Sequence, residues 1–224
     1  ETAYADQNGR WLAYAALSTL ESMGPPGRDY QYQGPVISGA TLGVWEHVPF
    51  SPEHMAHSST FQGRTHSVDL PLKPKPDPEA LQREIERWEK RYQEADESGD
   101  PVAARDARAL AERARRWLAR LDSLPDGPTY PYHFSAYRLG DAVWVTCGGE
   151  PYNVLQVELR RRFPETPILL SPVSGDHPVA YLLPEDRYGQ GLYQEEPSIL
   201  APGCLERVID AIAIQINELL GDQQ

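Results

Sequence analysis

The architecture of this chain is clearest in one segment, Ala142-Val143-Trp144-Val145-Thr146-Cys147-Gly148-Gly149-Glu150-Pro151. Its first six residues are mostly β-branched, aromatic or small and apolar, which is typical of a buried strand, and the two glycines end that strand. Positions 154–159 continue with apolar residues at helical spacing, and Ile168-Leu169-Leu170 is a second short apolar run. A strand, a helix and a strand in this order predict an α/β core with parallel pairing.

The flanking sequence extends this core on both sides. Positions 130–139 alternate between apolar and polar residues and lead to Gly140-Asp141, which predicts a β-hairpin with a tight turn into the buried strand. Positions 202–220 have the apolar spacing of a last helix. We therefore expect an α/β fold in which helices flank a mixed sheet.

The first third of the chain is expected to contain a helix, strands and a loop. Apolar residues recur at helical spacing over 9–20, which predicts an amphipathic helix that faces the core. Valine, isoleucine, threonine and tryptophan with interspersed glycines over 33–50 predict bent strands. The segment 51–67, which carries three histidines among Ser and Thr, is predicted to be a loop.

A charged segment between Asp77 and Asp122 is predicted to form an antiparallel helical hairpin inserted into the α/β domain. Two apolar stripes are separated by Ser98-Gly99-Asp100-Pro101, in which Asp100 is a suitable N-cap and Pro101 a suitable first helical residue. The stripes consist of Leu81, Ile85, Trp88 and Tyr92 in the first helix and of Ala107, Leu110, Ala114, Trp117 and Leu121 in the second. The Glu and Arg of the remaining faces favour a structural arm over a surface that binds a partner.

Composition limits the classes of protein to which the chain can belong. Its 224 residues, 40% of them hydrophobic, are enough for one substantial core, so we expect a single α/β domain over residues 1–224. The formal charge of −12 argues against a nucleic-acid partner, because such binding depends on clustered Lys and Arg. No apolar run approaches the roughly 20 residues that span a bilayer, so no transmembrane segment is expected. The oligomeric state has no signature in the sequence.

Two further features concern the start of the chain and its compartment. Residue 1 is Glu rather than Met, and a helix follows soon after it without a signal peptide before it, so we expect that an N-terminal part of the domain precedes this chain. The only cysteines, Cys147 and Cys204, form no disulfide framework and no CxxC motif, and they leave the redox compartment undecided.

Glu150 is the first candidate for a functional residue, because it stands where a buried strand gives way to a helix. Ligands bind beyond the carboxyl ends of strands in α/β sheets, where loops and helix N-termini converge. Gly148 and Gly149 allow a sharp turn there, and Pro151 is expected to be the first helical residue. The alternative is that the Glu150 carboxylate only interacts with the positive end of the helix. The junction by itself leaves both interpretations open.

A second junction, 174–185, follows the strand at 168–170 and would face Glu150 if the two strands are parallel. Asp176 next to His177 is consistent with an acid–base pair in which the carboxylate orients the imidazole. The alternative is an ordinary solvated loop histidine, since adjacent residues rarely orient one another.

Several short motifs stand in a fixed order between residues 130 and 220. They are Arg138-Leu139-Gly140-Asp141-Ala142-Val143-Trp144-Val145, Gly149-Glu150-Pro151, Ala180-Tyr181, Glu185, Tyr188, Gly191-Leu192-Tyr193 and Ala201-Pro202-Gly203. In this order they resemble the C-terminal part of the catalytic domain of the neutral ceramidase family, zinc amidohydrolases with short bacterial relatives. The resemblance implies that Glu150 and Tyr181 bind zinc and that Tyr193 assists at the reacting carbonyl. Three positions depart from the family pattern: Ala180 replaces a glycine, Pro178 an aromatic residue and Gln194 a glutamate.

The function implied by this resemblance is hydrolysis of the N-acyl amide bond of ceramide-like lipids by zinc-activated water, with a small amphiphilic amide as substrate. The resemblance also implies a secreted or periplasmic protein, and further zinc ligands, histidines, upstream of this chain. His54-x-x-His57 is an internal alternative, although its loop context favours coincidence. Two other functions remain open: a related hydrolase of another amide or ester, and a non-catalytic binding module that uses the helical hairpin.

Overall fold

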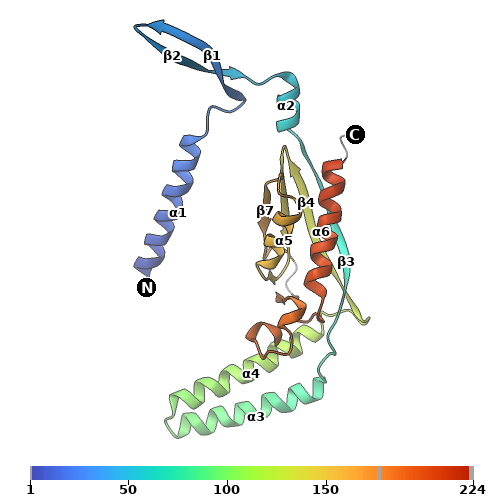
Figure 1. Cartoon of the computed structure of the whole chain (residues 1–224). Helices are drawn as coiled ribbons and strands as arrows, with labels where there is room; N and C mark the ends of the chain where they lie inside the picture. The colour runs from blue at the N-terminus through green and yellow to red at the C-terminus, as the bar shows by residue number, and fades with distance from the viewer. Residues whose placement is uncertain (1, 176–177, 222–224) are drawn as a thin grey trace. The chain divides into compact units, whose positions relative to one another are not determined.

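The computed structural model describes residues 2–175 and 178–221 (Figure 1). The chain divides into two compact units, Glu1–Thr60 and Phe61–Gln224, where the sequence predicts a single domain. The boundary falls between the last helix of the first unit and the first strand of the second.

The first unit consists of a helix, a β-hairpin and a short helix. These elements are α1 (Thr2–Ser22), β1 (Arg28–Ser38), β2 (Ala40–Pro49) and α2 (Pro52–Ser58). β1 and β2 are antiparallel, and their register is irregular between Tyr32 and Gly34. Strands therefore form over the predicted range 33–50, the first of them starts earlier, at Arg28, and its irregularity lies next to a glycine.

Helix α1 forms where helical spacing predicts it, but the prediction that it faces a core is wrong for the part of the helix that is described. None of the described α1 residues is buried, and Trp11 and Leu12 are 62% and 74% exposed. Helical spacing shows which side chains share a face and does not show what covers that face. The helix itself is therefore confirmed, and the burial inferred for it is not.

The prediction of a loop over 51–67 is also wrong. Ser51 caps α2 by accepting a hydrogen bond from the backbone N–H of His54 (3.1 Å), and Pro52 stands at the helix start. After α2, β3 (Phe61–Pro71) pairs along its whole length with β4 (Thr129–Leu139). The sequence of β3 does not by itself predict a strand. The segment becomes a strand because it pairs with β4, which is distant in the sequence.

The second unit is built on a mixed sheet with the strand order β3-β4-β5-β7. β5 (Ala142–Cys147) is antiparallel to β4 and parallel to β7 (Ile168–Ser171). Gly140, which has a φ of 59°, and Asp141 connect β4 to β5. The predicted tight turn, parallel pair and mixed sheet are confirmed.

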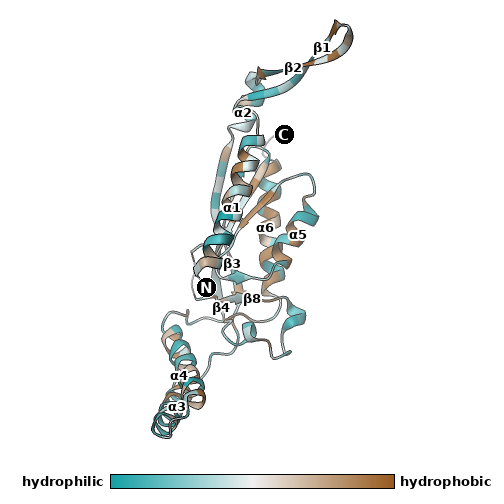
Figure 2. Cartoon of the chain, turned by 90° about the vertical axis from the view of Figure 1, so that its left-hand side faces the viewer, coloured by the Kyte–Doolittle hydropathy of each residue, from teal (hydrophilic) through white to brown (hydrophobic). Residues whose placement is uncertain are grey.

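Helices α5 (Val154–Arg162) and α6 (Cys204–Gly221) pack against one face of this sheet (Figure 1). Alternate residues of β4 and β5 are buried with them in one hydrophobic cluster. These residues are Tyr130, Tyr132, Phe134, Ala136, Val143, Val145 and Cys147. Figure 2 shows long hydrophobic stretches in α6 and a mixture of hydrophobic and hydrophilic colours in the two helices of the hairpin. Of the helices that the structure describes, none has the length and apolarity to cross a membrane.

The charged segment forms the predicted helical hairpin, made of α3 (Pro78–Glu97) and α4 (Pro101–Leu121) (Figure 1). Asp77 and Asp100 cap the two helices, and each accepts hydrogen bonds from two backbone N–H groups of the first turn. The buried residues between the helices are Leu81, Ile85 and Ala95 in α3 and Ala104, Ala107, Ala111 and Ala114 in α4. Small alanines on α4 let the two helices approach closely.

Candidate functional site

The turn after β5 depends on Gly149. Its φ is +68°, and a Cβ atom added there would lie 2.9 Å from the carbonyl oxygen of Ala180. The preceding carbonyl oxygen, that of Gly148, accepts a hydrogen bond from the hydroxyl of the buried residue Tyr132 (2.8 Å). The chain can therefore turn sharply at Gly149 and run close to the segment that contains Ala180.

This turn places Glu150 beside Tyr181. Glu150–Pro151 forms the short strand β6, which is parallel to β8 (Tyr181–Leu182), and Glu150 pairs with Tyr181. The backbone N–H of Glu150 donates to the carbonyl oxygen of Ala180 at 2.6 Å. Side chains alternate along a strand, so two residues directly opposite each other project from the same face of the pair. The two residues that the resemblance assigns to zinc are thus neighbours on one face.

The prediction that Pro151 is the first helical residue is wrong. Pro151 belongs to β6, and α5 begins at Val154 after Asn153, whose side chain makes no capping hydrogen bond. Pairing with β8 keeps the backbone extended for two more residues before the helix starts. Glu150 therefore stands four residues before the start of α5, and both interpretations of its carboxylate stay predictions.

Ala180, directly before Tyr181, has a φ of +55°. L-residues other than glycine seldom adopt this conformation, which costs roughly 1–2 kcal/mol. Glycine would adopt it without a Cβ penalty, and glycine is the residue that the resemblance leads one to expect at this position. Ala180 therefore adopts a backbone conformation that suits glycine, and this adds strain next to Tyr181.

Tyr193 completes the group of candidate residues. It starts a 3₁₀ helix, η2 (Tyr193–Glu195), and its ring lies edge-on to that of Tyr181, with the centroids 6.0 Å apart and the planes at 72°. The Tyr193 side chain is 71% exposed. The structure thus brings together all three residues named from the sequence, Glu150, Tyr181 and Tyr193.

The electrostatic surroundings of Tyr181 favour its neutral form. Partial desolvation raises the pKa of the phenol, and the negative charge of Glu150 and the neighbouring Tyr193 raise it further. A nearby cation would have the opposite effect, because it stabilises the phenolate. The Tyr181 phenol is therefore neutral at ordinary pH in this structure, and it would have to lose its proton to bind a cation as a phenolate.

Several residues around the site had no signal in the sequence. Ser198, which is buried, donates from its hydroxyl to the carbonyl oxygen of Tyr181 (2.7 Å). Lys73 lies in a proline-rich segment and donates from Nζ to the carbonyl oxygen of Glu195 (2.5 Å). Burial lowers the pKa of Lys73, and the charges of Glu195 and Glu196 partly offset this effect. These contacts join segments far apart in the chain, so no local pattern could have predicted them.

Glu150 and Tyr181 offer two oxygen donors to a metal ion. No group of three or more His, Cys, Asp or Glu residues suited to a metal occurs within 2–175 and 178–221. His54 and His57 lie on α2 of the first unit, where His54 Nδ1 is 3.4 Å from Asp29 Oδ2 and the imidazole stacks on Phe50. The proposed acid–base pair of Asp176 and His177 lies outside the described residues.

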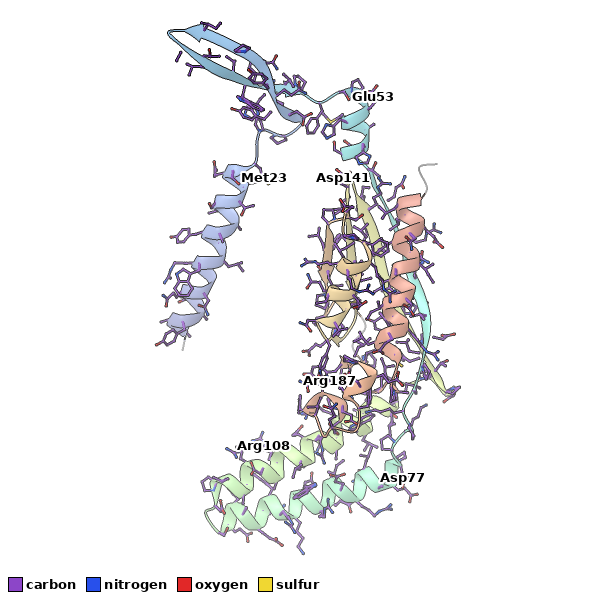
Figure 3. The ribbon with its side chains drawn as sticks, viewed as in Figure 1. Met23, Glu53, Asp77, Arg108, Asp141 and Arg187 are labelled. Atoms are coloured by element: carbon purple, nitrogen blue, oxygen red, sulfur yellow. The ribbon has the colours of Figure 1, made fainter. Side chains whose placement is uncertain are left out.

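The candidate site lies in the second unit. Figure 3 shows the segment marked by Arg187 between the sheet and the helical hairpin, whose helix α4 carries Arg108.

Comparisons of the chain with protein-family models, with curated proteins and with solved structures find no match.

Proposed function

We propose that this chain contributes to the active site of a zinc amidohydrolase similar to the neutral ceramidases, which hydrolyses the N-acyl amide bond of ceramide-like lipids. The observation that carries the proposal is the pairing of Glu150 with Tyr181, with the ring of Tyr193 next to Tyr181. Three residues named from short, separated motifs meet at one place. The strand order alone predicts that the junctions of Glu150 and Tyr181 face each other, so the added support for the resemblance comes from Tyr193, whose ring lies next to that of Tyr181.

The residues present fit part of a zinc site. Carboxylate oxygen is an ordinary zinc ligand, and a catalytic zinc takes three protein ligands and keeps one open position. Glu150 and Tyr181 would supply two of the protein ligands, and the resemblance assigns the others to upstream histidines. When bound, zinc lowers the pKa of a water molecule toward 7 and polarises the substrate carbonyl.

The roles of the chain's own residues follow from their positions. Glu150 and Tyr181 would hold the cation from one face of the β6–β8 pair. The exposed hydroxyl of Tyr193 would donate a hydrogen bond to the carbonyl oxygen of the amide, where negative charge develops during hydrolysis. Removing one such donor typically lowers kcat by about 10²- to 10³-fold.

The sequence and the structure support the identity of the substrate less directly than they support the zinc ligands. Ala180, Pro178 and Gln194 depart from the family pattern, and all three are close in sequence to Tyr181 or Tyr193. These departures favour a second candidate function, hydrolysis of a related amide or ester by the same residues. Faster turnover of short N-acyl amides than of ceramide would support the second candidate.

The test is the zinc content of the complete natural protein. We expect about one zinc per chain in the wild type, loss of zinc and of amidase activity in Glu150→Ala, and retention of both in Glu165→Ala. Glu165 is the matched control because it is an exposed glutamate of the same unit, in the loop between α5 and β7. Full zinc content in Glu150→Ala would refute the proposal.

A further inference from the structure

The segment that carries Tyr193 is held by both ends of the helical hairpin. Lys73, which precedes α3, donates to the carbonyl oxygen of Glu195 at 2.5 Å. Arg120, in the last turn of α4, donates to the carbonyl oxygen of Pro197 at 2.6 Å. Both hydrogen bonds are partly buried, so they are partly shielded from competing water.

Trp117 joins the hairpin to the rest of the second unit. Its ring packs against the hydrophobic cluster of the sheet and also against the smaller cluster between α3 and α4. Its indole Nε1 donates to Oε1 of Glu196 (2.8 Å), and Nε of Arg113 lies 3.8 Å from the same oxygen. Two residues of α4 therefore hold the side chain of Glu196, three positions after Tyr193.

The segment 189–198 also makes hydrogen bonds within itself and to the backbone of Tyr181. The Glu195 carboxylate accepts hydrogen bonds from the backbone N–H of Gly189 at 3.0 and 3.1 Å. Ser198 donates to the carbonyl oxygen of Tyr181. A change in the path of residues 195–198 would therefore move Tyr193 relative to Tyr181.

We propose that the α3–α4 hairpin is a positioning arm for Tyr193: Trp117 and Arg120 fix Glu196 and Pro197, and thereby set the Tyr193 ring against that of Tyr181. Displacement of a catalytic group by about 1 Å can lower a rate about 10²-fold, so such an arm matters for activity. The catalytic consequence rests on the proposed function, whereas the positioning itself does not. The structural arm predicted from the mixed charges of the hairpin thus gains a specific role.

The positioning can be tested without any activity by fluorine NMR of the protein labelled with 3-fluorotyrosine. The signals of Tyr193 and Tyr181 are assigned from Tyr193→Phe and Tyr181→Phe. We expect the Tyr193 signal to shift in Trp117→Phe and in Glu196→Ala, and to stay near its wild-type position in Glu196→Gln, because the amide oxygen still accepts from the indole. An unchanged Tyr193 signal in both Trp117→Phe and Glu196→Ala overturns the proposal.

Trp88→Phe is the matched control. The indole Nε1 of Trp88 donates to Oε1 of Glu84 within the same helix, at 3.2 Å, so this variant removes an equivalent hydrogen bond that makes no direct contact with Glu196 or Pro197. It leaves in place the ion pair of Glu84 with Arg113 (3.1 Å). We expect the Tyr193 signal to be unchanged in Trp88→Phe. An equal shift in both tryptophan variants would mean that any perturbation of the hairpin suffices, and it would also overturn the specific role of Trp117.

Kinetics of the complete natural protein test the catalytic consequence. We expect kcat to fall about tenfold in Trp117→Phe and Glu196→Ala at unchanged zinc content and nearly unchanged KM, with recovery in Glu196→Gln. An unchanged kcat in both variants, in a protein whose zinc depends on Glu150, overturns the positioning role and leaves the proposed function standing. Zinc retained in Glu150→Ala refutes the proposed function, and the fluorine signals then decide the positioning alone.

Discussion

Glu150 lies directly opposite Tyr181 in the parallel pairing of β6 with β8. This relationship depends on the backbone conformation of the residue directly before each of them, because Gly149 and Ala180 both have positive φ. The two positions nevertheless differ in the residue they carry. Substitutions there can therefore test how the pairing is maintained.

Gly149→Ala is expected to destabilise the protein and to disrupt the pairing. The positive φ alone costs roughly 1–2 kcal/mol for a residue with a Cβ atom, and the added methyl group would also meet the carbonyl oxygen of Ala180 at 2.9 Å. Urea unfolding of the purified chain measures the loss. Gly99→Ala is the matched control, since Gly99 has a φ of +72° and open space around an added Cβ. An equal loss in the two variants would show that the close approach to Ala180 is unimportant.

Ala180→Gly is expected to stabilise the protein by about 0.5–1 kcal/mol. Relief of the left-handed conformation gains roughly 1–2 kcal/mol, and the larger entropy of glycine in the unfolded chain removes roughly 0.5–1 kcal/mol of that gain. Ala109→Gly, in the exposed interior of α4, should instead destabilise by about 1 kcal/mol. A lower urea midpoint for Ala180→Gly than for the wild type would contradict the positive φ at this position.

These two positions also show what the sequence could and could not predict. The strand at 142–147, the glycine turn and the strand at 168–170 are local patterns. With parallel pairing they predict that the junction containing Tyr181 faces Glu150, and the observed pairing of β5 with β7 is parallel. The strands β6 and β8 are two residues each, too short for a periodic signal, so the sequence predicts Pro151 in the helix and not in a strand. Contacts such as Trp117 with Glu196 depend on where the hairpin lies in the folded chain, which no local pattern specifies.

Alkaline pH is expected to destabilise the second unit through Tyr188. Desolvation raises the pKa of this phenol to about 12, and its hydroxyl donates to the carbonyl oxygen of Leu200 (3.0 Å). Because the folded-state pKa exceeds the unfolded value of about 10, the contribution to stability is complete below pH 10 and is lost as the pH rises toward 12.

The measurement for Tyr188 is the urea midpoint as a function of pH from 8 to 12. Tyr188→Phe should be less stable than the wild type at pH 8, because the Leu200 carbonyl loses its donor, and its stability should fall less steeply above pH 10. Tyr92→Phe, on the hairpin, controls for the loss of a tyrosine elsewhere in the unit. Parallel pH profiles for Tyr188→Phe and the wild type would exclude Tyr188 as the source of the alkaline loss.

Tyr181→Phe and Tyr193→Phe are expected to separate metal binding from catalysis in the complete natural protein. Each variant removes one hydroxyl, and the two rings are neighbours with centroids 6.0 Å apart. Of these two tyrosines, only Tyr181 is a zinc ligand in the proposed site, so Tyr181→Phe should lose zinc together with activity. Tyr193→Phe should keep its zinc and lose about 10²- to 10³-fold in kcat, with a small change in KM, because the donated hydrogen bond strengthens as charge develops on the carbonyl oxygen. Zinc content by elemental analysis and steady-state kinetics on the same samples measure both effects.

Equal zinc loss in the two variants would assign both tyrosines to the metal, and unchanged zinc in both would remove Tyr181 from the ligand set.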